Sequence, residues 1–390
     1  MSDPNPKTTA AGMAATVQEA GAAAQPSISA ATDPLKLLGQ VLAHAVKVGA
    51  SDVHLRTRNH PILRVDGALR ALREIPPLPP DFMDRLSRTM MSARLQAMFE
   101  KDHQVDLSIG FKDIGRVRAN LFYQRGSIGM VLRVINTNIP TPQELRLPSI
   151  VNDLIKLERG LVLVTGATGS GKSTTLASLI NQINLTRSDH IITIEDPIEF
   201  LFTEKKSIIT QREVGIDTST FADALRAALR EDPDVILLGE MRDPETIETA
   251  MLAAETGHLV FSTVHSPAAA ETVSRVITSF SAEGQPAVRA KLAQNLRAVV
   301  SQRLLPHKSG QGRTVACEVM SMSQLARELI LDPLKIRDLS DLIKRGTVAD
   351  GMLSFDQSLY NLARSGDIDE ETALYYASSP TDLKLKLEGY

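Results

Sequence analysis

The chain of 390 residues contains few residues of the kinds that form cross-links or stacking surfaces. It has one cysteine, Cys317, no tryptophan, and 4% aromatic residues. A single cysteine cannot form an internal disulfide bond, and no cluster of cysteine and histidine has the spacing of a zinc site. We therefore expect a protein of a reducing, cytosolic compartment.

The sequence also lacks long apolar runs and an excess of basic charge. No segment approaches the ~18 consecutive apolar residues of a membrane span, and the first residues do not resemble a signal peptide. The formal net charge is -3, so no global basic field attracts nucleic acid, and the scarce aromatic residues offer no platform for stacking bases. We expect a soluble protein without a nucleic-acid partner, which can still dock on a membrane complex.

Composition divides the chain into a tail and two folded regions. Residues 1–33 are rich in Ala, Ser, Pro and Gly, and we expect a disordered tail because they cannot bury enough apolar surface to offset the entropy of ordering. Residues 34–136 are predicted to form a small α+β domain with a mostly antiparallel sheet. Residues 137–148 are typical of a linker because they contain prolines. Residues 149–390 form the larger predicted domain.

Local patterns predict the elements of both domains. In the smaller one, alternating residues indicate hairpins over 62–72 and 115–135, with a helix over about 84–100 between them. In the larger one, apolar strands alternate with helices, which predicts an α/β fold with a parallel sheet covered on both faces. The predicted strands are 161–165, 191–194, 235–238 and 259–264. From about Ala287 to the end we expect a helical region.

A glycine-rich segment follows the first strand of the larger domain. Residues 166–174 read GATGSGKST, which matches the phosphate-loop pattern between a buried strand and a helix. Backbone N–H groups would surround the phosphates of ATP, Lys172 would reach the β and γ oxygens, and the Ser173 hydroxyl would bind Mg²⁺. The predicted nucleotide-binding residues are Gly166, Thr168, Gly169, Ser170, Gly171, Lys172, Ser173 and Thr174.

Acidic residues follow two further strands of the same domain. IEDPIE covers residues 194–199 and GEMRD covers 239–243. Ligands of open α/β sheets lie at the carboxyl ends of the strands, so these acids are expected beside the phosphate loop. We assign Glu240 to Mg²⁺ and its water. Glu199, with Glu195 as the alternative, would orient the attacking water as general base.

Histidines and arginines complete the set of candidate residues. His258 and His265 bracket the strand 259–264, and the pair could sense the γ-phosphate, although His258 alone is typical of a structural residue. Arginines usually make an exposed strand soluble, but a guanidinium can also stabilise the charge that develops in phosphoryl transfer. Four of them lie along the second hairpin of the smaller domain: Arg116, Arg118, Arg125 and Arg133.

The chain closely resembles the PilT/PilU-type retraction ATPases of bacterial type IV pili, within the secretion ATPase superfamily. The segments that carry the resemblance are GATGSGKSTT, HIITIEDPIEF, TQREVG, ALRAALREDPDVILLGEMRDPETI, AAETGHLVFSTVH and NLRAVVSQRL. The resemblance implies an N-terminal PAS-like domain, a RecA-like ATPase domain, and a hexameric ring with ATP between the domains at the subunit boundary. Hydrolysis to ADP and phosphate would drive pilin depolymerisation and twitching motility.

The resemblance also implies roles for individual residues. IEDPIE falls at the family's Asp box, LLGEMRD at its Walker B motif and GHLVFSTVH at its His box, which supports roles for Glu199, Glu240, His258 and His265. The positions where the family places arginines that approach the nucleotide hold Arg118, Arg125 and Arg133. Which arginine acts as the finger stays open.

Partners and location follow from the same resemblance. The implied cofactors are ATP and Mg²⁺. The implied partners are further copies of the chain in a homo-hexamer and a pilus platform protein of the inner membrane, and a paralogous retraction ATPase is a further candidate. The protein would be cytoplasmic and peripheral at the cytoplasmic face of the bacterial inner membrane.

Other functions within and outside this family stay open. A PilU-like accessory ATPase, or a slow regulatory one, is an alternative, because KIRDL at 335–339 is followed early by GMLSFDQSL at 351–359. Retraction ATPases carry an AIRNLIR-like helix and a longer spacing there. Pilus extension and type II secretion ATPases are a further alternative, but they have a four-cysteine zinc insert that a single cysteine excludes. A motor on DNA is disfavoured by the acidic charge balance.

Overall fold

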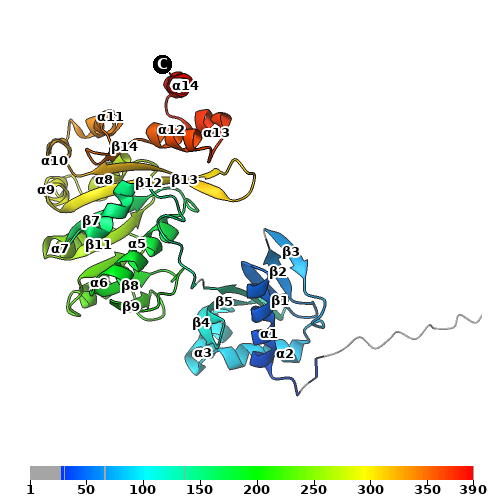
Figure 1. The fold of residues 1–390 in the computed structure, drawn as a ribbon. Coiled ribbons are helices and arrows are strands. Elements are labelled where there is room, and N and C mark those ends of the chain that lie inside the picture. Colours follow the sequence, from blue (N-terminus) through cyan, green and yellow to red (C-terminus); the bar gives the residue numbers. More distant parts are fainter. Residues whose placement is uncertain (1–27, 30, 66, 136, 390) are drawn as a thin grey trace, which may run out of the picture. The chain divides into compact units, whose positions relative to one another are not determined.

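The computed structural model describes residues 28–389 except residues 30, 66 and 136. Most of the predicted tail, residues 1–27, lies outside the described residues. The chain divides into two compact units, one ending at Val134 and the other beginning at Ile135 (Figure 1). Within the described residues, no helix is both long and apolar enough to span a bilayer.

The first unit is built on a sheet of six antiparallel strands in the order β3-β2-β1-β6-β5-β4. The strands are β1 (Asp52–Arg56), β2 (Ile62–Val65), β3 (Ala68–Ala71), β4 (Gln104–Phe111), β5 (Gly115–Gln124) and β6 (Ser127–Val134). The helices are α1 (Pro34–Lys47), α2 (Pro80–Met90) and α3 (Ala93–Asp102). The β2–β3 and β5–β6 pairs confirm both predicted hairpins and the antiparallel sheet.

Two details of the first unit differ from the predictions. The helix predicted over residues 84–100 is two helices, because Met91 adopts an extended conformation and Ser92 caps α3. Strand β4 was not predicted. Along β5, Val117, Ala119 and Leu121 are buried, whereas the alternating arginines point to the opposite face, as a period of two residues requires.

The second unit contains a sheet of eight strands in the order β14-β13-β12-β7-β11-β10-β8-β9. The strands are β7 (Gly160–Thr165), β8 (His190–Glu195), β9 (Ile208–Glu213), β10 (Val235–Leu238), β11 (Leu259–Val264), β12 (Leu296–Pro306), β13 (Arg313–Ser321) and β14 (Met352–Leu353). Strands β7 to β12 pair in parallel, and β13 and β14 pair antiparallel to their neighbours.

Helices cover both faces of this sheet. Leu161 and Leu163 of β7 join an apolar cluster with α7 (Pro244–Glu255) and α8 (Ala269–Thr278), whereas Val162 and Val164 join a cluster with α5 (Lys172–Thr186) on the other face. This confirms the predicted parallel sheet covered on both sides. The first helices are α4 (Ser149–Asn152), η1 (Asp153–Lys156), α5 (Lys172–Thr186), α6 (Phe221–Ala228), α7 (Pro244–Glu255), α8 (Ala269–Thr278) and α9 (Gln285–Asn295).

The prediction of a helical region from Ala287 to the end was wrong for β12 and β13. Strand β12 pairs with β7 on one side and with β13 on the other, and Val299 and Val300 at its centre are fully buried. Adjacent β-branched residues with no exposed face fit a central strand better than an amphipathic helix. Helices do follow: α10 (Gln324–Leu331), η2 (Ile336–Asp338), α11 (Leu339–Arg345), α12 (Phe355–Ser365), α13 (Glu370–Tyr376) and α14 (Pro380–Glu388).

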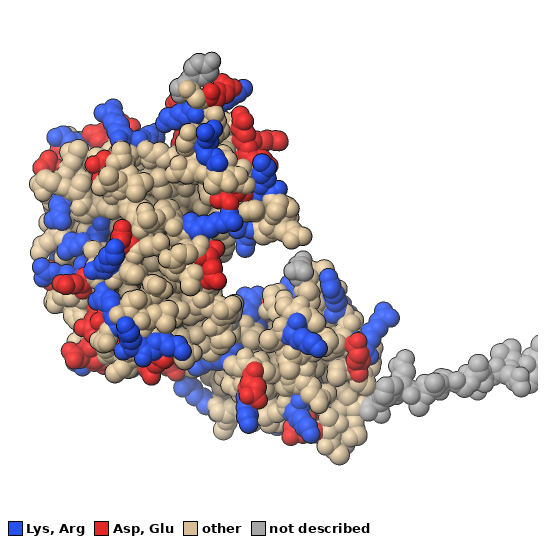
Figure 2. Space-filling model, in the orientation of Figure 1, with Lys and Arg blue, Asp and Glu red and all other residues tan. Residues whose placement is uncertain are grey.

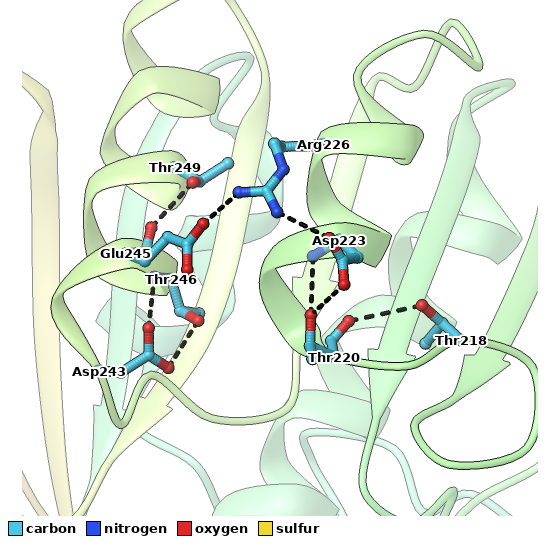
Figure 3. Close-up of polar contacts among 8 residues, drawn as sticks. All are labelled: Thr218, Thr220, Asp223, Arg226, Asp243, Glu245, Thr246 and Thr249. Carbon is cyan, nitrogen blue, oxygen red and sulfur yellow. Dashed lines mark hydrogen bonds and ion pairs between the residues drawn. The ribbon is translucent and has the colours of Figure 1, made fainter.

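Side chains fix the starts of α6 and α7 and join the two helices (Figure 3). The Asp243 carboxylate caps α7 by accepting a hydrogen bond from the Thr246 N–H at 2.8 Å. Thr220 caps α6 in the same way. Arg226 of α6 pairs with Asp223 and with Glu245 of α7. Elsewhere, acidic and basic side chains are interspersed on the face that Figure 2 shows.

Candidate functional site

The glycine-rich loop connects the carboxyl end of β7 to the amino end of α5. Gly166, Gly169 and Gly171 have φ angles of 143°, 77° and 92°, a region that residues with a Cβ rarely adopt. A Cβ on Gly166 would lie 2.5 Å from the Gln302 carbonyl oxygen of β12. The loop therefore depends on glycine both for its turns and for its close approach to the neighbouring strand.

Lys172, the first residue of α5, points back into this loop. Its ammonium group donates hydrogen bonds to the carbonyl oxygens of Gly166 and Ala167 at 3.0 and 3.1 Å, and the residue is 8% exposed. Burial lowers the pKa of Lys172, while the negative charges of Glu240 and Glu199 oppose this shift. A cation is thus held at the mouth of the loop, where a phosphate oxygen would bind.

A cavity of 300 Å³ opens beside the loop at the carboxyl ends of the parallel strands. Strand β10 lies between β8 and β11, and β11 pairs with β7, so the residues after these strands meet at one edge of the sheet. The cavity brings the predicted acids and His265 together with part of the phosphate loop. Its lining includes Thr168, Gly169, Lys172, Ser173, Glu195, Glu199, Glu240, Arg242 and His265.

Glu240 is held by two cationic or polar neighbours. Its carboxylate lies 2.7 Å from Nη2 of Arg242 and 3.3 Å from Nε2 of His265. Although burial alone would raise the pKa of Glu240, the hydrogen bond from Arg242 and the charge of His265 together hold it below its usual value. Glu240 is therefore ionised at neutral pH. The Thr263 hydroxyl supports the turn by donating to the Gly239 carbonyl oxygen at 2.6 Å.

Glu195, at the end of β8, has a different environment from Glu240. Burial raises the pKa of its carboxyl group to about 7, and hydrogen bonds from Thr193 and Gln211 only partly oppose this shift. The Thr193 hydroxyl donates at 2.6 Å and Nε2 of Gln211 donates at 3.2 Å. Glu199 lines the same cavity four residues later. The two glutamates of IEDPIE are thus unequal, since Glu195 is a partly buried hydrogen-bond acceptor and Glu199 is exposed.

The structure does not bring His258 to this cavity, which corrects the idea that both histidines face the phosphate. Strand β11 runs parallel to β7, with Leu259 opposite Gly160 and Val264 opposite Thr165. His258 precedes β11 and so lies at the edge of the sheet opposite the phosphate loop. Its Nδ1 contacts the Ala253 carbonyl oxygen at 2.9 Å, a structural role at the end of α7.

The predicted arginines lie in the first unit, whereas the cavity is built from residues of the second. Arg118 of β5 and Arg133 of β6 are directly opposite each other in the sheet. Arg133 pairs with Asp52 at 2.7 Å, and Arg118 lies 3.8 Å from Asp106. Arg125 occupies the hairpin turn with a φ of 51°.

A second cavity, of 640 Å³, lies on the other side of the phosphate loop. Gly171 and Thr174 form one wall, the β12–β13 hairpin forms another, and Arg146 contributes from the segment predicted as a linker. Arg146 pairs with Asp367, the residue after the Gly366 that ends α12, and its Nη1 lies 3.4 Å from Nε2 of His307. The loop therefore has an acidic cavity on one side and a roomier cavity on the other.

The sequence did not single out several residues of these cavities. Arg242 lies within LLGEMRD, part of a segment that carries the resemblance. Gln211, which hydrogen-bonds to Glu195 from outside the cavity lining, lies within TQREVG, another such segment. Arg146 and His307 had no signal, because their contact joins positions 161 residues apart.

Comparison with known proteins gives consistent relationships. Residues 31–345 match the family model described as type II/IV secretion system protein. The chain is 43% identical to the type IV pilus retraction ATPase PilT of Pseudomonas aeruginosa over 87% of this chain and 98% of that one. It is 41% identical to the type IV pilus ATPase PilU of the same organism over 90% of this chain and 91% of that one.

A solved structure shows the same relationship. A crystal structure of the pilus retraction motor PilT with bound ADP has a TM-score of 0.82 and 46% sequence identity, covering 89% of this chain and 99% of that one. This likeness confirms the predicted fold class, an α/β RecA-like domain with a smaller N-terminal α+β domain.

The loop geometry predicts that two glycine substitutions lower the free energy of unfolding by different amounts. Gly169→Ala places a Cβ in open space and should lower the free energy of unfolding by ~1–2 kcal/mol through backbone strain alone. Gly166→Ala adds a collision with the Gln302 carbonyl, so we expect a distinctly larger loss. Urea unfolding of both variants measures the difference, and equal losses would contradict the close approach of the loop to β12.

The raised pKa of Glu195 should make the stability of the protein depend on pH. Its pKa is raised from the ordinary 4.5 to about 7 in the folded state, so its favourable contribution is complete below pH 4.5 and is lost as the pH rises through 7. The loss amounts to at most about 3 kcal/mol. Glu195→Gln should remove it, so the variant should gain in Tm relative to the parent between pH 5 and 8. The exposed substitution Glu248→Gln serves as control, and a Tm gap independent of pH would refute the expectation.

Proposed function

The chain belongs to the type II/IV secretion system protein family, and on this basis we propose that it is an ATPase whose hydrolysis cycle drives retraction of a type IV pilus. The observation that carries the proposal is the single cavity that joins the phosphate loop to Glu199, Glu240 and His265. The relatives named for pilus retraction match this chain over nearly its whole length. In this proposal, ATP hydrolysis drives pilin depolymerisation, and the resulting retraction produces twitching motility.

The two cavities support one path for the nucleotide across the loop. Because acids surround the cavity of 300 Å³, the γ-phosphate and the attacking water belong on that side. The rest of ATP then crosses the amino end of α5 at Ser173 and Thr174. Its ribose and base extend into the cavity of 640 Å³, beside Arg146 and His307.

The residues of the acidic cavity divide the chemical work. The N–H groups of the loop and Lys172 bind the phosphate oxygens, and the dipole of α5 adds to this attraction. Glu199 orients a water molecule towards the γ-phosphorus and takes its proton at a carboxylate oxygen. His265 connects Glu240 to the phosphate side of the cavity. Arg118, Arg125 and Arg133 are candidates for stabilising the developing charge from the first unit of this chain or of another copy.

The oxygen atoms of this cavity fit Mg²⁺. Ser173 and Glu240 line it together and offer a hydroxyl and an ionised carboxylate, which are the oxygen ligands that this cation prefers. When bound, Mg²⁺ would neutralise charge on the phosphates. We propose that Ser173 holds it directly and Glu240 partly through water.

The assembly and location of the protein are part of the proposal. We propose a homo-hexamer that works at the cytoplasmic face of the inner membrane on a pilus platform protein. Residues 34–136 and 149–390 would be the moving domains, joined by residues 137–148. An accessory role beside a paralogous retraction ATPase is the second candidate, which the similarity to PilU supports.

Substitution of the two acids tests the enzymatic proposal. Glu240→Gln and Glu199→Gln should each lower kcat by about 10² to 10⁴-fold, because general-base catalysis and charge stabilisation are lost while the phosphate loop remains. The Kd for a non-hydrolysable ATP analogue should stay within a few-fold. Glu245→Gln, which removes a charge that pairs with Arg226 outside the cavity, is the matched control. Hydrolysis by Glu240→Gln at the parental rate would disprove the assignment.

Cells that lack the gene test the pilus proposal. We expect them to be covered with pili and unable to twitch, because assembled pili are no longer withdrawn. Complementation with the parental gene should restore motility, whereas the Glu240→Gln gene should not. Cells without surface pili would instead indicate an extension ATPase. Retained retraction that fails only under load would favour the accessory role.

A further inference from the structure

Gln211 lies outside the predicted site and is hydrogen-bonded to the segment that carries Glu199. It lies in the middle of β9, the edge strand of the large sheet, and faces Thr193 of β8 across the parallel ladder. Its side-chain amide makes three hydrogen bonds. Nε2 donates to the Phe200 carbonyl oxygen at 3.0 Å and to the Glu195 carboxylate at 3.2 Å, and Oε1 accepts from the Phe202 N–H at 3.0 Å.

These hydrogen bonds hold the chain on both sides of Glu199, at Glu195 before it and at Phe200 and Phe202 after it. Residues 196–202 leave the carboxyl end of β8 and contain no helix or strand of their own. Glu199 directly precedes Phe200, whose carbonyl Gln211 binds. The side-chain amide of Gln211 thus acts as the backbone of a neighbouring strand would. It accepts a hydrogen bond from the N–H of Phe202 and donates one to the carbonyl oxygen of Phe200.

We propose that Gln211 is a positioning residue that sets the place of Glu199 over the nucleotide and thereby controls the hydrolytic step. The inference rests on the proposed ATPase function. It adds to that function a residue whose side-chain hydrogen bonds reach the cavity lining at Phe200, Phe202 and the Glu195 carboxylate.

The arrangement separates catalysis from binding. A catalytic base must be held to within about 0.5 Å of its working position, and a displacement of about 1 Å can cost 10²-fold in rate. Affinity for ATP comes mainly from the loop and Lys172, which Gln211 does not touch. Loss of Gln211 should therefore lower kcat and leave the Kd for nucleotide nearly unchanged.

The experiment uses the full chain with two substitutions at this position. Gln211→Leu removes all three hydrogen bonds at similar side-chain volume, and we expect kcat to fall by about 10- to 100-fold while the Kd for a non-hydrolysable ATP analogue changes less than about twofold. Gln211→Glu keeps an oxygen for the Phe202 N–H but turns a second oxygen towards the Phe200 carbonyl and the Glu195 carboxylate, so we expect a loss of kcat at least as large as that of the leucine variant. It also provides a second test should the leucine variant fail to fold.

A matched control comes from the next residue of the same strand. Arg212 pairs with Glu231 at 3.0 Å on the opposite side of β9, so Arg212→Gln removes one polar contact of the edge strand without touching the segment of Glu199. We expect its kcat to match the parent. If Arg212→Gln and Gln211→Leu lose the same Tm and the same kcat, Gln211 serves only the stability of β9 and the inference is overturned.

A double-mutant cycle separates this inference from the proposed function itself. Because Gln211 acts through Glu199, Gln211→Leu should reduce the residual rate of Glu199→Gln by less than about twofold. Multiplied losses would show that Gln211 acts independently of Glu199 and would overturn the inference. A parental chain that hydrolyses no ATP would overturn the proposed function, whereas an active parent with equally active Gln211 variants overturns the positioning role alone.

Discussion

The parallel alignment of β7, β11, β10 and β8 is the constraint on which the site depends. Parallel strands end at the same edge of a sheet, so residues separated by long stretches of sequence meet there without further design. The phosphate loop follows β7, His265 follows β11, Glu240 follows β10 and Glu195 ends β8. Each strand is buried on both faces. The burial that stabilises the sheet therefore also fixes the positions of the functional groups relative to one another.

The same edge sets unequal charges on neighbouring acids. Glu240 stays ionised because Arg242 and His265 lie beside it, whereas burial raises the pKa of Glu195 to about 7. Two fully ionised carboxylates next to each other would repel both a phosphate and one another. A site in which Glu195 is partly protonated at neutral pH leaves Glu240 and Glu199 as the negative charges near Lys172 and reduces that repulsion. Burial and neighbouring charges thus determine the protonation of each acid.

Much of this arrangement could be predicted from the sequence because the signals were local. Continuous apolar runs marked β7, β8, β10 and β11, and glycines at fixed spacing marked the loop after β7. The rule that ligands bind at the carboxyl ends then placed Glu240 and Glu199 beside it. The start of α7 is equally local, because Asp243 followed by Pro244 is the pattern of an N-cap and a first helical residue. In each case the physical cause lies within a few residues of the feature that it predicts.

The features that escaped prediction have causes that are distant in the sequence. Strand β12 follows directly on helix α9 and was assigned to the same helical region, whereas its place between β7 and β13 shows it to be a central strand. His258 and His265 were treated as a pair because both adjoin one strand, yet the direction of that strand puts them at opposite edges. Gln211 illustrates the limit most clearly. An edge-strand glutamine is usually a solvated side chain, and here it holds a segment that begins 15 residues earlier in the sequence because β9 lies directly beside β8. Its importance arises from strand order, and strand order is a property of the whole sheet.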